Sequence, residues 1–241
     1  THCISSAASD VYKRQLYDDA QSIYNGPKKL RFSFSSVGVQ AQGRTTILKL
    51  NYRNTAEILA VARAFADDLL SEKDTGEDQM PTVQPMSTGR HGMKPLLIKL
   101  PKLRDELEYL ADRLSNANKT GMPWNQMAVI YRHYGIGKEV TQILSRKGIP
   151  FEWSQDKKKS FTPNHDSVKI VTIHSSKGLE FPLVCIPGIG ATATHAESVE
   201  EEARLLYVAM TRATHELVMT HGEDSVITKK MEKAMTTLDS I

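Results

Sequence analysis

A histidine and a lysine follow directly on an apolar run in the segment 168–181, which reads VKIVTIHSSKGLEF. The apolar part predicts a buried strand, and the polar part predicts a tight turn at its end. His174, Lys177 and the nearby hydroxyls suit contacts with phosphate oxygens, and Gly178 lets the backbone turn closely. A single histidine in such a place is commonly a hydrogen-bonded structural residue, so this segment alone leaves both interpretations open.

Two arginines lie where predicted elements meet. Arg53 belongs to the segment 50–55, LNYRNT, at the junction of a strand and a helix-capping sequence. Its planar guanidinium can bind a phosphate, and Tyr52 beside it can stack on a base, although a surface carboxylate is an equally good partner for the arginine. Arg212 lies near the end of the predicted helix 200–213, where it can also simply complement the helix dipole.

Two further segments carry weaker signals. Residues 18–24, DDAQSIY, place two acids and an amide before an aromatic residue, and a simple turn explains them as well. Residues 132–139, RHYGIGKE, only partly match a phosphate-binding loop, because Arg132 replaces its first glycine and Glu139 replaces its magnesium-binding hydroxyl. We therefore do not interpret this segment as a phosphate-binding loop, and we find no acidic magnesium-binding motif in the sequence.

The elements that must position these segments alternate between short apolar runs and amphipathic helical patterns. The predicted strands are 46–50, 95–100, 127–131, 149–153, 168–173 and 183–186. Four helices are predicted: the first begins at Asn54, the second covers 103–114, the third ends at Gly148 and the fourth covers 200–213. This alternation predicts an α/β fold with a mostly parallel sheet covered by helices on both faces. In such sheets a ligand site is expected at the carboxyl ends of the strands.

Composition sets broad limits on the class of protein. A hydrophobic content of 40 % is enough to bury a core, and 31 basic against 28 acidic residues permit a nucleic-acid partner without arguing for one. The two cysteines show no disulfide or zinc spacing. No apolar stretch approaches the roughly 20 residues that span a bilayer. We expect a cytoplasmic protein with no membrane partner.

The four segments, in this order, resemble the UvrD/Rep/PcrA family of superfamily-1 DNA helicases. The patterns TxHxxKGLE at 172–180 and LLYVAMTRA at 205–213 are highly specific together, NYR at 51–53 is moderately specific, and DxQSIY at 19–24 adds support. The resemblance covers about 16–222. It implies a RecA-like fold and, within it, the second, C-terminal motor domain of such a helicase.

The resemblance also implies roles for individual residues. For ATP they are Gln21 at the terminal phosphate, Tyr52 on the adenine, Arg53 and Arg212 at the γ-phosphate, and Glu180 at the sugar. Among these, Gln21 and the two arginines are the expected catalytic residues. The implied DNA contacts are Thr172, His174, Tyr24 and, in the Tyr-Arg segment, Arg132.

The resemblance divides the chain unevenly. Residues 1–15 are interpreted as a sequencing or assembly scar, 16–45 as a remnant of the first motor domain, 46–222 as the second RecA-like domain, and 223–241 as a C-terminal helix and tail. Because only about 120 residues separate positions 53 and 172, we expect that the large inserted subdomain of UvrD and PcrA is missing. The ligands of Mg²⁺ are expected in the missing first motor domain.

The function implied is that of the C-terminal motor domain of an ATP-dependent 3′-to-5′ DNA helicase. Such an enzyme couples hydrolysis of ATP with Mg²⁺ to translocation on single-stranded DNA and unwinding at a duplex junction, in partnership with its N-terminal motor domain. The isolated chain is expected to be inactive. Two alternatives remain open, a non-catalytic module that binds nucleic acid or a protein partner, and the helicase part of a RecB-like helicase-nuclease.

Overall fold

The computed structural model describes residues 50–67, 86–87, 89–155, 162, 164–190 and 199–240. Within these residues the main feature is a six-stranded sheet in which every pair of neighbouring strands is parallel. Its strands, in order across the sheet, are β3 (Leu96–Lys99), β8 (Ala213–His221), β7 (Phe181–Ile186), β4 (Met127–Tyr131), β6 (Val168–Thr172) and β5 (Phe151–Trp153). The predicted α/β class with a parallel sheet is confirmed.

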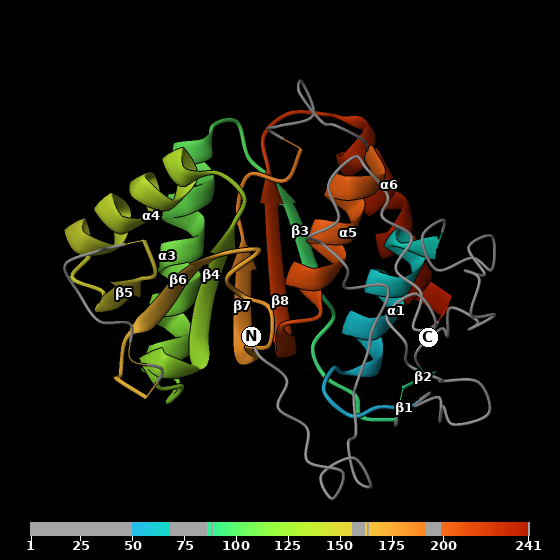
Figure 1. The fold of residues 1–241 in the computed structure, drawn as a ribbon, viewed down its shortest axis with the longest axis horizontal. Helices are drawn as coiled ribbons and strands as arrows, with labels where there is room; N and C mark the ends of the chain where they lie inside the picture. Colours follow the sequence, from blue (N-terminus) through green and yellow to red (C-terminus); the bar gives the residue numbers. More distant parts are fainter. Residues whose placement is uncertain are drawn as a thin grey trace, which may run out of the picture.

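Helices cover both faces of this sheet (Figure 1). The helices α3 (Leu103–Lys119) and α4 (Tyr134–Arg146) share a core with one face, and α1 (Ala56–Phe65), α5 (Val199–Met210) and α6 (Val226–Met235) share a core with the other. The two cores divide β4 by alternation, because Val129 packs with α3 and α4 whereas Ile130 packs on the opposite side. Burial on both faces explains why the central strands read as continuous apolar runs.

Two short strands and two short 3₁₀ helices complete the described fold. The strands β1 (Leu50–Asn51) and β2 (Met86–Ser87) form a separate parallel pair. Single turns of 3₁₀ helix occur at η5 (Trp124–Gln126) and η6 (Thr236–Ser240). The helix α6 lies within 223–241, and none of the described helices is long and apolar enough to cross a membrane.

The structure corrects the predicted end of the chain's long helix. Helix α5 ends at Met210 rather than at 213, and the next two residues form a turn into β8. That strand, the longest in the sheet, was not predicted at all. Its sequence ATHELVMTH shows no clear alternation of apolar and polar residues, because the charged Glu216 is buried there. Arg113 is its partner, with Nε 2.6 Å from Glu216 Oε1.

The first predicted helix also begins one residue later than expected. Thr55, not Asn54, is the N-cap of α1, and its side chain accepts a hydrogen bond from the Ile58 amide. Threonine serves as an N-cap because its hydroxyl satisfies an amide that has no partner within the helix. The Asn54 side chain is therefore left for a different contact, which positions the site described next.

Candidate functional site

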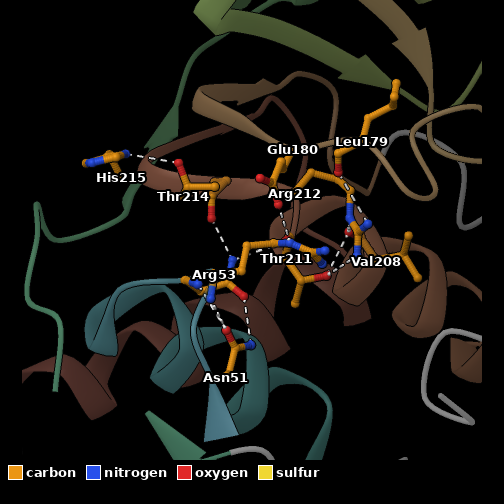
Figure 2. Close-up of polar contacts among 11 residues, drawn as sticks. Asn51, Arg53, Leu179, Glu180, Val208, Thr211, Arg212, Thr214 and His215 are labelled. Carbon is orange, nitrogen blue, oxygen red and sulfur yellow. Dashed lines mark hydrogen bonds and ion pairs between the residues drawn. The ribbon is translucent and has the colours of Figure 1, made fainter. Parts of the chain in front are cut away.

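Segments far apart in the sequence meet beside the amino ends of β7 and β8 (Figure 2). Asn54, which is 1 % exposed, donates from its side-chain amide to two carbonyl oxygens around the start of β8, at 3.1 Å to Thr211 and 2.6 Å to Ala213. The residue between these acceptors is Arg212, and the residue before Asn54 is Arg53. A single buried asparagine therefore fixes the two arginine-bearing segments against each other.

Arg53 forms an exposed ion pair with Glu180, which lies immediately before β7. Its Nε lies 2.7 Å from Glu180 Oε2, and the two side chains are 37 % and 57 % exposed. The Arg53 amide donates to the Asn51 side chain at 2.9 Å, which fixes the direction of the backbone at this point. The sequence left a phosphate and a surface carboxylate as possible partners of Arg53. In this structure Arg53 pairs with a carboxylate, and the pair is open to solvent.

Arg212 is buried, with 1 % of its surface exposed. Its guanidinium donates to the carbonyls of Val208 at 3.0 Å and Leu179 at 3.3 Å and to the Thr211 hydroxyl at 3.1 Å. Such acceptors offset the cost of removing the charge from water. The bond to Val208 lies at the end of α5, which agrees with the simpler interpretation of Arg212 as a residue that complements the helix terminus.

Tyr52 is the most exposed large hydrophobic residue among those described, at 72 %. It lies between the strand β1 and Arg53, so its ring is close in sequence to the ion pair with Glu180. An exposed phenol ring offers a flat surface for a planar ligand, and the next residue along the chain carries a cation that suits an anionic one. The four residues that the sequence predicts at a nucleotide are called the nucleotide-facing group, and they are Tyr52, Arg53, Glu180 and Arg212.

A second set of predicted residues lies at the opposite edge of the sheet. Thr172 ends β6 and lies opposite Tyr131, the last residue of β4, so that Arg132 follows at the same carboxyl edge. The Thr172 hydroxyl lies 2.9 Å from the Ser175 hydroxyl and accepts from the Ser175 amide at 3.1 Å. We define the carboxyl-edge group as Arg132, Thr172 and His174.

Charges within the carboxyl-edge group are balanced by the first turn of α5. Arg132 Nε lies 3.1 Å from Glu202 Oε2, and these side chains are 29 % and 9 % exposed. Burial, together with the Arg132 charge, lowers the pKa of His174 below its ordinary value. The imidazole is therefore neutral at neutral pH and serves as a hydrogen-bonding group rather than as a cation.

The residues predicted from the sequence thus separate into two groups at opposite edges. The expectation that the site lies at the carboxyl ends of strands holds for the carboxyl-edge group, but it is wrong for Glu180 and Arg212, which precede β7 and β8. Residues 173–180 explain the difference, because they lead from the end of β6 back to the start of β7. One short segment contributes to both groups. Gln21 and Tyr24 lie outside the described residues.

The glycines of the segment 132–139 lie within a helix. Helix α4 begins at Tyr134, so Gly135 and Gly137 are helical rather than part of a loop before a helix. A Cβ added at Gly137 would collide with the ring of Tyr131, which explains the glycine by close packing. This agrees with the interpretation that the segment is not a phosphate-binding loop. No group of three or more potential metal ligands is found among the described residues.

Sequence reasoning missed Asn54 as a residue that organises the site. Its pattern was read as a helix cap, and nothing in the local sequence indicates acceptors more than 150 positions away, at Thr211 and Ala213. One signal was present in the sequence. Thr55 can cap the helix by itself, so a second capping residue at Asn54 is not needed and its side chain can serve another purpose.

Comparison with known proteins gives a consistent picture. A family model described as the UvrD-like helicase C-terminal domain matches residues 46–161 and 152–224. The ATP-dependent DNA helicase PcrA of Bacillus subtilis is 37 % identical over 75 residues, which are 28 % of this chain and 10 % of that protein. DNA helicase II of Escherichia coli is 42 % identical over 65 residues, 24 % of this chain and 9 % of that protein. The matched part therefore spans about a tenth of these relatives.

A solved structure has the same fold. It is the crystal structure of the C-terminal domain of a possible DNA helicase from Lactobacillus plantarum WCFS1, and the two chains superpose with a TM-score of 0.55. The superposition covers 77 % of this chain and 96 % of that one, at 20 % sequence identity. At this identity the likeness concerns the fold alone.

Proposed function

Because this chain belongs to the UvrD-like helicase C-terminal domain family, we propose that it supplies one half of an ATP site to a DNA helicase whose other half lies on a first motor domain. The nucleotide-facing group would meet the adenine and the γ-phosphate, with Arg53 and Arg212 stabilising the charge that develops on the transferred phosphoryl group. The relatives that support this proposal are named as ATP-dependent or DNA helicases.

One observation carries the proposal. Asn54 holds the Arg53 segment against the Arg212 turn through two bonds from a buried side chain. Rigid positioning of this kind is what an electrostatic contribution to catalysis requires, because misplaced charges stabilise a transition state poorly. In this arrangement Arg53 would leave Glu180 for the nucleotide, and Glu180 would be released to contact the sugar.

The carboxyl-edge group is the proposed contact to single-stranded DNA. Thr172 and Ser175 offer hydroxyls, His174 a neutral imidazole and Arg132 a cation, all of which suit the sugar-phosphate backbone. Opening and closing of two motor domains on ATP would change this contact and move the chain along the strand, in the 3′-to-5′ direction, toward a duplex junction. Mg²⁺ would be held by the first motor domain, as the resemblance to the helicase family implies.

The domain division expected from the sequence is part of this proposal. Residues 46–222 would be the second motor domain without a large inserted subdomain, 223–241 its C-terminal extension, and 16–45 a remnant of the first motor domain. Within 46–222, the six strands β3, β4, β5, β6, β7 and β8 belong to one sheet. Cytoplasmic location follows from the same proposal.

The proposal is tested by joining this chain to the first motor domain of Bacillus subtilis PcrA and measuring release of phosphate from ATP with and without single-stranded DNA. We expect hydrolysis that DNA stimulates in the joined polypeptide and none in the isolated chain. Joined material that is folded by circular dichroism, binds DNA and still does not hydrolyse ATP would favour a non-catalytic binding module. Hydrolysis by the isolated chain would contradict the shared site.

A further inference from the structure

Two aromatic rings lie against each other at the carboxyl edge of the sheet, outside both groups defined above. Tyr134 is the first residue of α4 and Trp153 the last residue of β5, and their ring centroids are 5.1 Å apart with an angle of 37° between the planes. Tyr134 is 62 % exposed. A large exposed ring that meets its neighbour on one side leaves the remainder of its surface accessible to a ligand.

This ring pair is held by a buried anchor. The Trp153 indole donates from Nε1 to the Tyr131 hydroxyl at 2.6 Å, and Tyr131 is fully buried at the end of β4. The Tyr131 ring packs directly on Gly137 of α4, the same helix that carries Tyr134. Both partners of the pair are therefore fixed to one rigid unit, which lowers the entropy cost of binding a ligand there.

The ring pair adjoins the carboxyl-edge group. Trp153 lies opposite Ile170 in the register of β5 and β6, and Thr172 is two residues further along the same face of β6. Arg132 precedes Tyr134 by two positions, with His133 between them. Burial and the Arg132 charge lower the pKa of His133, so it is neutral at neutral pH. The rings and the carboxyl-edge group thus lie at the same end of the sheet, with Thr172 on the strand next to that of Trp153.

We infer that Tyr134 and Trp153 form a stacking platform for the bases of single-stranded nucleic acid. The inference rests on the proposed function, because the carboxyl-edge group would hold the backbone while the rings receive the bases. Base stacking on aromatic side chains is tolerant of sequence and needs bases that are unpaired, so a duplex is a poor ligand for such a platform. The polar neighbours favour this occupant over a protein segment, which would place apolar side chains on the rings.

The platform can be tested in the complete 241-residue chain by tryptophan emission. The chain contains two tryptophans, so Trp124→Phe leaves Trp153 as the only reporter. Titration with oligodeoxythymidylate at low salt is expected to quench Trp153 emission to saturation. Tyr134→Ala is expected to weaken the affinity about tenfold, because it removes a ring on which a base would stack. Tyr134→Phe keeps the ring and is expected to keep the affinity.

A second readout separates this inference from the proposed function. Fluorescence anisotropy of a labelled oligonucleotide reports binding without using the rings, and Arg132→Ala is expected to weaken it with a smaller salt dependence. If the oligonucleotide binds and Arg132→Ala weakens it, but Trp153 emission and Tyr134→Ala show no effect, the platform is overturned and the DNA contact stands. Equal quenching by a matched duplex would also overturn the platform. Failure of any oligonucleotide to bind would overturn both.

Discussion

Replacing Arg53 by alanine is expected to lower kcat for DNA-stimulated ATP hydrolysis by about 10³-fold in the polypeptide that joins this chain to a first motor domain, because an arginine at the transferred phosphoryl group contributes roughly 10³ to 10⁵ in rate. The KM for ATP is expected to change much less, since the interaction is strongest in the transition state. Steady-state phosphate release over a range of ATP concentrations provides both constants.

Because Arg53 is exposed, its replacement is expected to change the rate without unfolding the protein. Its ion pair with Glu180 is exposed, so its loss is expected to change the free energy of unfolding by no more than about 1 kcal/mol. Arg53→Lys keeps the charge without the planar fork and is expected to recover only part of the rate. Arg104→Ala, at an exposed position of α3, is the matched control and is expected to leave the rate unchanged. A rate within threefold of the parent for Arg53→Ala would contradict a catalytic role.

Arg212 is expected to give a mixed result in the same assay. Its guanidinium donates to acceptors on Val208, Leu179 and Thr211, so Arg212→Ala removes these three hydrogen bonds and is expected to cost stability as well as rate. In the described arrangement it lies beneath the surface rather than on it. Arg53 is therefore the sharper probe of the nucleotide-facing group.

Replacing Lys169 by alanine is expected to destabilise the fold by about 3–5 kcal/mol, the usual cost of breaking a buried ion pair from one side. The Lys169 side chain is 1 % exposed, and its Nζ lies 2.6 Å from Glu152 Oε2. The same ammonium donates to the carbonyls of Thr162 at 2.8 Å and His165 at 2.9 Å and to the Ser167 hydroxyl at 3.1 Å. Urea denaturation followed by circular dichroism measures the loss.

An exposed pair of the same geometry is the control for Lys169. Lys99 Nζ also lies 2.6 Å from a carboxylate oxygen, that of Asp224, but these side chains are 53 % and 54 % exposed. Lys99→Ala is therefore expected to cost less than about 1 kcal/mol. Similar losses for the two variants would show that the burial of Lys169 does not decide its contribution.

The Glu152 carboxylate gives the Lys169 pair a defined pH dependence. Burial acts to raise the pKa of Glu152, but the Lys169 ammonium, the Thr162 amide and His165 together outweigh it, so the pKa lies below its ordinary value. The contribution of the pair is therefore complete above the ordinary carboxyl pKa and is lost as the pH falls through the lower, folded value.

Local pattern predicted the parts of this fold that are repeated and apolar. The strand at 127–131 was correctly predicted because it is a continuous apolar run, and the helix beginning at 103 because its apolar residues recur at helical spacing. The strand β8 was missed because Glu216 is buried and looks like a surface residue until Arg113, more than 100 positions earlier, is placed beside it. Polar residues with distant partners carry no local signal.

The candidate site shows the same division. Motif order identified Arg53, Glu180 and Arg212, and the structure brings their segments together. The placement of Glu180 and Arg212 at the amino ends of strands could not be predicted. It depends on the path of 173–180 across the sheet and on the two long-range hydrogen bonds that the Asn54 side chain donates. Tertiary geometry, not residue type, separates the nucleotide-facing group from the carboxyl-edge group.

The most direct measurement of the shared nucleotide site is photolabelling of the joined polypeptide with 8-azido-ATP, followed by tryptic digestion and mass spectrometry. Cleavage after Lys49 and after Arg53 releases residues 50–53, which contain Tyr52. We expect label on this peptide, competed away by ATP and absent from the isolated chain. Specific labelling confined to the first motor domain, in a polypeptide that hydrolyses ATP, would contradict the claim that this chain forms half of the site.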